Sequence, residues 1–187
     1  PLNPATTYKA KVKNAVLKYS KYNSVTNGDK ITFHTPDLTL DNSQVIWIGE
    51  TNTSAVPQVD LFFNYRVSPE DLKSKLNIEV EGRKADFNMI TISPDNKISV
   101  RINGLKAEDK DIDAKLSIEK GLKPEKGSTS TADAIASSLT IPSPYLLTVQ
   151  NVESEHDGME GVVRVTTSQQ LTGESLKSFL KFDPDIA

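Results

Sequence analysis

The chain has 187 residues and a net charge of −3, with 25% charged and 36% apolar residues, a composition typical of a folded protein. Four arginines and a slightly acidic balance disfavour a nucleic-acid binder, because phosphate affinity needs clustered cations, and no apolar run approaches the roughly 20 residues that span a bilayer. The absence of cysteine excludes disulfides, thiolate zinc sites, cysteine nucleophiles and iron–sulfur clusters.

Short segments in which apolar and polar residues alternate run through most of the chain. A period of two is typical of strands that bury one face, so the chain is predicted to be all-β. The run 45–48 is apolar throughout, which predicts a strand that is buried on both faces or passes under the core. The predicted strands are, in chain order, 8–12, 31–35, 45–48, 59–67, 76–80, 98–102 and 112–118.

Turns are expected at Glu81–Arg83, Ser93–Asn96 and Asn103–Gly104, where Gly, Pro and Asn separate the apolar runs. About seven strands in roughly 100 residues predict an antiparallel β-sandwich of immunoglobulin-like type. The cysteine pair of antibody domains is missing, so this likeness concerns architecture only.

Helix is predicted only as short turns. Ser68 offers a cap hydroxyl and Pro69 occupies the first helical position, with two acids following in the first turn. We expect the Ser68 hydroxyl to bind an amide left free at the helix start. A copy of this turn is expected after Thr172, and another short helix over Ala132–Ser138.

One segment of the chain is repeated. Val59–Ile78 and Val163–Phe182 superpose without gaps at a spacing of 104 residues, so that Leu72 matches Leu176. Each copy consists of an alternating strand, a Ser or Thr at a helix N-cap, one helical turn and a second alternating strand. The spacing defines a repeating unit that is shorter than the chain.

A weaker similarity links the other parts of the unit. Pro1–Tyr8 resembles Gly121–Ser128, and Ile31–Pro36 resembles Ser138–Pro142. We therefore predict immunoglobulin-like modules in tandem, and a fragment of an array rather than a chain with a trimmed leader. The predicted units are the C-terminal half of one module (1–36), a complete module (37–142) and the N-terminal half of a following module (143–187).

These segments resemble a known family. Pro1–Val12, followed by Ile31–Thr35, resembles the closing half of a bacterial immunoglobulin-like module, which often ends with a Pro-Leu-x-Pro-x-Thr-x-Tyr strand and a Phe-x-Thr strand. Val59–Ile78 and Val163–Phe182 resemble the opening half. Stacked copies at this spacing are similar to the N-terminal region of bacterial alpha-2-macroglobulin-like proteins, especially the Bacteroidetes type.

The resemblance implies a non-catalytic scaffold fragment of a cell-envelope protein that traps proteases. It implies a periplasmic or outer-surface location, lipid-anchored through the parent protein, and as partners the neighbouring modules and, through the parent, proteases. The family captures proteases with a Cys–Gln thioester, which a chain without cysteine cannot hold. No functional residue of the family maps onto this chain, so no enzyme activity, no cofactor and no catalytic, cofactor-binding or metal-binding residue is predicted.

Alternating Asp109, Asp111 and Asp113 form the most site-like feature, because such carboxylates can surround a hard cation such as calcium. An EF-hand loop counted from Asp109 needs Gly at position 6 and Glu at position 12, where the chain has Ala114 and Lys120. The run is therefore interpreted as a solvated turn entering the next strand, with a weak calcium site as the alternative.

Only two histidines are available for acid–base or nucleophilic chemistry. His34 is predicted to point away from the Ile31/Phe33 face of its strand, and His156 lies in a turn signature with Asp157 and Gly158. No nucleophile-elbow sequence marks a partner serine, so structural roles are predicted for both.

The aromatic residues bear on the alternative functions. Trp47, Phe63 and Tyr65 are predicted to pack in the core, and Phe62 to face a neighbouring module. Exposed aromatics would instead support a tandem immunoglobulin-like adhesin or surface ligand-binding module. A pocket with a histidine and convergent carboxylates would support an enzyme accessory domain.

Half a sandwich leaves strand edges unpaired, and such edges invite pairing with a complementary segment. We therefore expect residues 1–36 and 143–187 to pair with one another, within the chain or between molecules.

Overall fold

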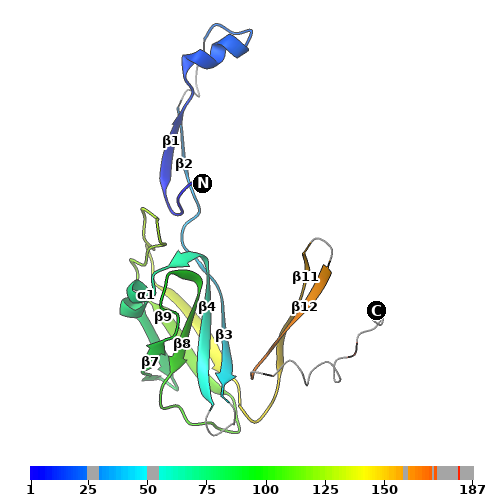
Figure 1. Cartoon of the computed structure of the whole chain (residues 1–187). Helices are drawn as coiled ribbons and strands as arrows, with labels where there is room; N and C mark the ends of the chain where they lie inside the picture. The colour runs from blue at the N-terminus through cyan, green and yellow to red at the C-terminus, as the bar shows by residue number, and fades with distance from the viewer. Residues whose placement is uncertain (25–29, 50–54, 158–159, 170, 172–180, 182–187) are drawn as a thin grey trace.

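Antiparallel strands make up most of the protein, which confirms the all-β prediction (Figure 1). The computed structural model describes residues 1–24, 30–49, 55–157, 160–169, 171 and 181. Its strands are β1 (Thr7–Lys11), β2 (Lys30–His34), β3 (Leu40–Ile48), β4 (Val56–Val67), β5 (Leu76–Val80), β6 (Arg83–Lys84), β7 (Phe87–Met89), β8 (Asp95–Ile102), β9 (Ile112–Ile118), β10 (Ile135–Ile141), β11 (Val149–Asp157) and β12 (Glu160–Thr167).

Two four-stranded antiparallel sheets form a sandwich around one core that runs from Leu38 to Ile141. One sheet has the strand order β3-β4-β8-β7, and the other has the order β10-β9-β5-β6. Alternate residues of each strand point inward, such as Val59 and Leu61 of β4, which are fully buried. Hydrophobic burial of these alternating side chains holds the two sheets together.

Strand β3 differs from its prediction. Val45 and Trp47 are buried, but Ile46 and Ile48 are only half-buried. The reason is that the β3-β4-β8-β7 sheet packs against the second sheet on one face only. The continuous apolar run therefore has one buried face rather than two.

Helix α1 (Pro69–Lys75) begins where the cap signal predicts. The expected capping bond is wrong, because the Ser68 hydroxyl makes no hydrogen bond to the helix. The Leu72 amide donates the ordinary first intrahelical bond to the Ser68 carbonyl oxygen at 3.0 Å. Asp71 and Lys75, one turn apart, form an ion pair at 3.0 Å.

Two further helical segments were predicted, over 132–138 and after Thr172. A helix over 132–138 is wrong, because β10 begins at Ile135 and pairs with β9 over its whole length. The turn after Thr172 lies outside the described residues. A 3-10 helix, η1 (Asn14–Tyr19), was not predicted. None of the helices in the described part of the chain has the length and apolar character needed to cross a membrane.

Two hairpins lie outside the sandwich. β1 pairs only with β2, and β11 pairs with β12, each as a separate two-stranded sheet (Figure 1). The expectation that 1–36 and 143–187 pair within the chain is therefore wrong for the described strands. Within each hairpin the two strands pair the backbone groups that face each other, whereas the groups on the outer edges are left for water to satisfy.

Hairpin β11–β12 copies hairpin β3–β4 in register. Leu40 pairs with Phe63 and Asn42 with Phe62, with a bulge between the two pairs. In the copy, Val149 pairs with Thr167 and Asn151 with Thr166, again with a bulge between them. Residues of β4 and β12 are thus related by the spacing of 104, and those of β3 and β11 by 109.

Hairpin β1–β2 copies hairpin β9–β10. Tyr8 pairs with Phe33 as Ala114 pairs with Leu139, so both strands are related by a spacing of 106. Pro36 and Pro142 follow at the same spacing, in agreement with the second sequence similarity. The first similarity, of 1–8 to 121–128, does not mark equivalent positions, because β1 corresponds to β9.

This correspondence predicts opposite outcomes for two equivalent residues. Leu61→Ala should destabilise the protein by about 3 kcal/mol, because it opens a cavity in the core. Val165→Ala, at the equivalent position of β12, should change stability by less than about 0.5 kcal/mol, because Val165 is 36% exposed. Urea unfolding followed by fluorescence of Trp47, the single tryptophan, measures both. Similar losses for the two variants would contradict the prediction.

Candidate interaction surfaces

The first hairpin carries an apolar face that no other described element covers. Tyr8, Ala10 and Val12 share this face with Ile31 and Phe33. The Tyr8 and Phe33 rings stack with centroids 5.6 Å apart, and Ile31 remains 55% exposed. Lysines alternate with these residues on β1 and occupy the opposite face.

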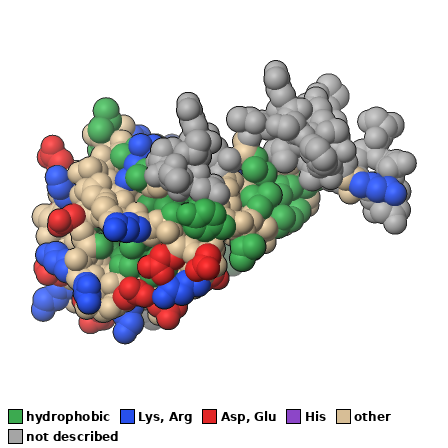
Figure 2. Space-filling model, turned by 90° about the horizontal axis from the view of Figure 1, so that it is seen from below, with side chains coloured by type: hydrophobic (Ala, Val, Ile, Leu, Met, Phe, Trp, Pro, Cys, Tyr) green, Lys and Arg blue, Asp and Glu red, His purple; other side chains and the backbone are tan. Residues whose placement is uncertain are grey.

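The second hairpin carries a similar face. Val152, Val163 and Val165 lie on one side of β11–β12 and are 60%, 42% and 36% exposed. The segment before it adds exposed Tyr145 and Leu146. Hydrophobic side chains gather in patches on the surface seen from below, beside an end rich in charges (Figure 2).

At the equivalent positions of the sandwich, an opposing sheet covers the apolar side chains. Val59 and Leu61 of the sandwich are fully buried, and they correspond to the exposed Val163 and Val165 of the hairpin. Leu116 of β9 corresponds to Ala10 and is 1% exposed. The hairpins therefore present core faces without the opposing sheet that covers such faces in the sandwich.

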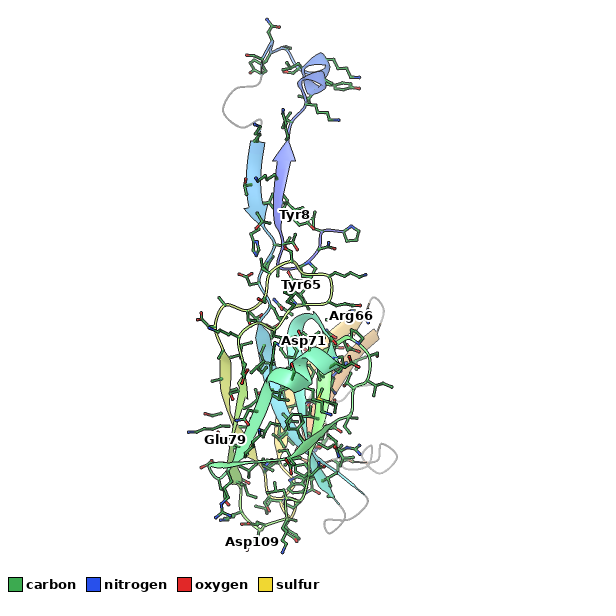
Figure 3. All side chains as sticks on the ribbon, turned by 90° about the vertical axis from the view of Figure 1, so that its left-hand side faces the viewer. Tyr8, Tyr65, Arg66, Asp71, Glu79 and Asp109 are labelled. Carbon is green, nitrogen blue, oxygen red and sulfur yellow. The ribbon has the colours of Figure 1, made fainter. Side chains whose placement is uncertain are left out.

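The first hairpin is tied to the sandwich through Ala5. Ala5 is buried and has a φ of 41°, a conformation that alanine rarely adopts. Its amide donates to the Pro36 carbonyl oxygen at 3.1 Å, and its carbonyl oxygen accepts from the Thr129 amide and hydroxyl at 2.9 and 2.7 Å. The loop that follows β9 thus holds the base of the hairpin. Figure 3 shows Tyr65 and Arg66 at this end of the sandwich, below Tyr8.

The second hairpin is tied to the end of β3. The Trp47 amide donates to the Ser168 carbonyl oxygen at 3.0 Å, and the Trp47 indole N–H donates to the Pro142 carbonyl oxygen at 2.6 Å. Gln150 donates to the Val45 carbonyl oxygen at 2.9 Å. These bonds join the β3 edge of the sheet to hairpin β11–β12.

One pair of bonds is repeated at the start of both copied hairpins. The Asn64 amide donates to the Thr39 carbonyl oxygen, and the Asn64 side chain accepts from the Thr39 amide at 3.0 Å. Ser168 and Thr148, at the equivalent positions, form the same two bonds at 2.9 and 3.0 Å. The structural copy therefore extends from the register to side-chain contacts.

A small polar groove of about 390 Å³ lies where the edge strands β3 and β10 meet. The Ser43 and Ser137 hydroxyls approach to 3.4 Å across this seam, and Gln150 reaches in from the second hairpin. Neither histidine lies among its residues, so the groove does not support the enzyme accessory alternative.

Asp60 is a fully buried charge on the outer side of β4. Its carboxylate accepts from the Ser99 hydroxyl at 2.7 Å and the Gln58 amide at 2.9 Å, and it lies 2.8 Å from Lys97 Nζ. Burial raises the pKa of Asp60, but the ammonium of Lys97 and the two hydrogen bonds outweigh it and lower the pKa below its ordinary value. Sequence patterns could not find this group, because an acid at an outward position of a strand is ordinary.

The structure places His34 between two polar groups. Nδ1 lies 2.9 Å from the Thr7 hydroxyl, and Nε2 lies 2.9 Å from the Asp37 carboxylate. The arrangement has the members of a nucleophilic triad, but Asp37 is 72% exposed, so water competes for the carboxylate that would orient the ring. These bonds link β1 and β2 to the segment before β3. His156 lies within β11 rather than in the predicted turn.

The acidic run does not converge on one point. Asp111 accepts from the Ser143 amide at 2.8 Å, and Lys110 pairs with Glu108 at 3.3 Å, which raises the pKa of Lys110. Asp109 lies at the far end of the sandwich from Tyr8 (Figure 3). In the described part of the chain, no three acidic or imidazole side chains are placed to hold a metal ion.

The aromatic residues divide into two groups. Trp47 and Phe63 are buried, as predicted, and Tyr65 is half-buried against the core. Tyr19 and Tyr22, beyond β1, are 80% and 77% exposed, and Lys18 lies over the Tyr19 ring at 4.7 Å. The alternating patterns of the sequence do not reveal this exposed pair, which a cluster of tyrosine and lysine without alternation indicates.

Comparison with known proteins adds no relative: no family model and no curated protein matches the chain.

Asp60→Asn should lower stability at neutral pH by about 2 kcal/mol, because it removes a buried charge that the Lys97 ammonium neutralises and that Ser99 hydrogen-bonds. Since the pKa of Asp60 is lowered on folding, its contribution is complete above about pH 4 and is lost as pH falls through the folded pKa. The difference between the native protein and the variant should therefore shrink below pH 4 in urea unfolding. Asp86→Asn, at an exposed position, is the control. A difference that is constant from pH 7 to pH 2 would contradict the prediction.

Proposed function

We propose that the chain is a non-catalytic scaffold built from tandem immunoglobulin-like modules. The observation that carries the proposal is the repeated register: β11–β12 copies the first hairpin of the sandwich, and β1–β2 copies its last. A chain that ends one sandwich, completes a second and opens a third has this order of hairpins. The modules are 1–36, 37–142 and 143–187.

The strand order supports the immunoglobulin-like assignment. With β3, β4, β5, β7, β8, β9 and β10 taken as strands A to G, and β6 as C′, the sheets have the orders ABED and GFCC′. Immunoglobulin-type sandwiches divide their strands in this way. The short ties at Ala5 and Trp47 support a mechanical role, since they fix hairpins to the two ends of one sandwich.

The parent protein proposed is an alpha-2-macroglobulin-like protease trap of the cell envelope, a proposal that depends on the motif resemblance alone. The gene downstream of Ala187 tests it. A Cys-x-x-Glu-Gln motif there, with covalent capture of a protease by the purified parent, would support the proposal. A parent without that motif would favour the adhesin, for which exposed Tyr19 and Tyr22 provide an observation of their own.

The modular organisation is tested with one substitution in two lengths of chain. Val163→Asp should leave the unfolding of residues 1–187 nearly unchanged, because Val163 is exposed there. In the parent extended through the next repeat it should cost about 3 kcal/mol, because the same position then lies in a core, as Val59 does.

Val162→Asp is the matched control, since Val162 faces the opposite side of β12 and corresponds to half-buried Gln58. It should be nearly neutral in both lengths. Equal effects of the two substitutions in the extended chain would overturn the modular assignment. Urea unfolding measures all four cases.

A further inference from the structure

The two hairpins carry the two halves of an interface that the sandwich already contains. Inside the sandwich, the apolar face of β9–β10 packs against that of β3–β4 in one core. β1–β2 carries the first of these faces and β11–β12 carries the second. We propose that hairpin β1–β2 of one copy of the chain binds hairpin β11–β12 of a second copy in this same arrangement, an inference that rests on the modular organisation proposed above.

The seam of the sandwich identifies the residues that meet. β10 lies beside β3, where Ser137 and Ser43 face each other. The equivalent residues of the hairpins are Ile31 and Val152, which are 55% and 60% exposed. Two exposed apolar side chains thus occupy the positions of two facing hydroxyls, and their contact removes both from water.

A second contact follows from the same correspondence. Trp47 donates its indole N–H to the Pro142 carbonyl oxygen. The equivalent residues are His156 and Pro36. The arrangement therefore places an imidazole, which can also donate an N–H, beside the Pro36 carbonyl group.

Charge favours this pairing over a pairing of like hairpins. Residues 7–34 contain six lysines and one aspartate, a net charge of +5. Residues 149–167 contain four carboxylates and one arginine, a net charge of −3. Attraction between unlike hairpins speeds their encounter, and repulsion opposes contact between two copies of the same hairpin.

The partner is a second copy because the hairpins of one chain stand apart. β1–β2 projects beyond one end of the sandwich, whereas β11–β12 is tied to β3 near the other end (Figure 1). A single contact between unlike surfaces of two copies leaves one of each surface free. The assembly is therefore head-to-tail, and it either closes into a ring or extends as the concentration rises.

Cysteine cross-linking tests the proposal, because the chain has no cysteine of its own. Ile31→Cys and Val152→Cys are prepared as separate full-length variants, one with a mass tag, mixed and oxidised. A mixed disulfide dimer should form about tenfold faster than in a mixture of Ile31→Cys with Ile92→Cys, whose residue is 92% exposed but lies outside both hairpins. The rate should fall with added salt.

Two further variants make the result decisive. Ser43→Cys/Ser137→Cys in one chain should form an internal disulfide, which verifies the reference seam, and Trp47 fluorescence verifies that every variant is folded. Mixed dimers that form no faster than the Ile92→Cys control would overturn the proposal. So would an internal disulfide in the monomeric Ile31→Cys/Val152→Cys chain, or faster homodimers of Ile31→Cys.

The two proposals fail separately. A negative cross-linking result together with a destabilising Val163→Asp in the extended parent would remove only the contact between copies. A neutral Val163→Asp in the extended parent would instead remove the modular organisation on which that contact rests.

Discussion

An amphipathic β-hairpin cannot bury its apolar face by itself, and this constraint governs the whole molecule. Two strands pair the backbone groups that face each other, but the side chains of one face need a second sheet about 10 Å away. The sandwich provides that second sheet for Val59, Leu61 and Leu116. The outer hairpins repeat the same registers without it, so their valines and aromatics remain at the surface.

The same constraint explains how the hairpins are held. Their faces contribute little packing to the sandwich, so polar contacts at their bases fix them instead. Ala5 is held in a left-handed conformation by bonds to Pro36 and Thr129. Trp47 belongs to the core and also holds the second hairpin. Its ring is buried, and its backbone and indole N–H groups donate to the carbonyl oxygens of Ser168 and Pro142. Short bonds of this kind restrict motion between each hairpin and the sandwich more than a flexible linker would.

Sequence patterns predicted the strands of the sandwich well because burial of one face imposes a period of two. They failed where another factor decided. The segment 132–138 has helix-compatible residues, but pairing with β9 made it a strand. The Ser68 hydroxyl was expected to cap α1, but it makes no hydrogen bond to the helix, although Ser68 and Pro69 stand where the cap signal places them. The buried charge of Asp60 is stabilised by Lys97 and Ser99, which lie nearly 40 residues away in the sequence. A pattern of neighbouring residues cannot reveal partners at that separation.

Copied hairpins within one chain create a risk of exchange, because each could replace its equivalent in the sandwich. The backbone registers are the same, so side chains must provide the discrimination. Trp47 fills a buried position of β3 that His156 occupies in the copy, and a histidine there would leave a cavity and bring a polar ring into the core. At the seam, Ser43 and Ser137 match each other, whereas pairing either hydroxyl with Ile31 or Val152 joins a polar group to an apolar one. Polar groups therefore meet polar groups and apolar groups meet apolar ones, and these differences keep the outer hairpins out of the central sandwich.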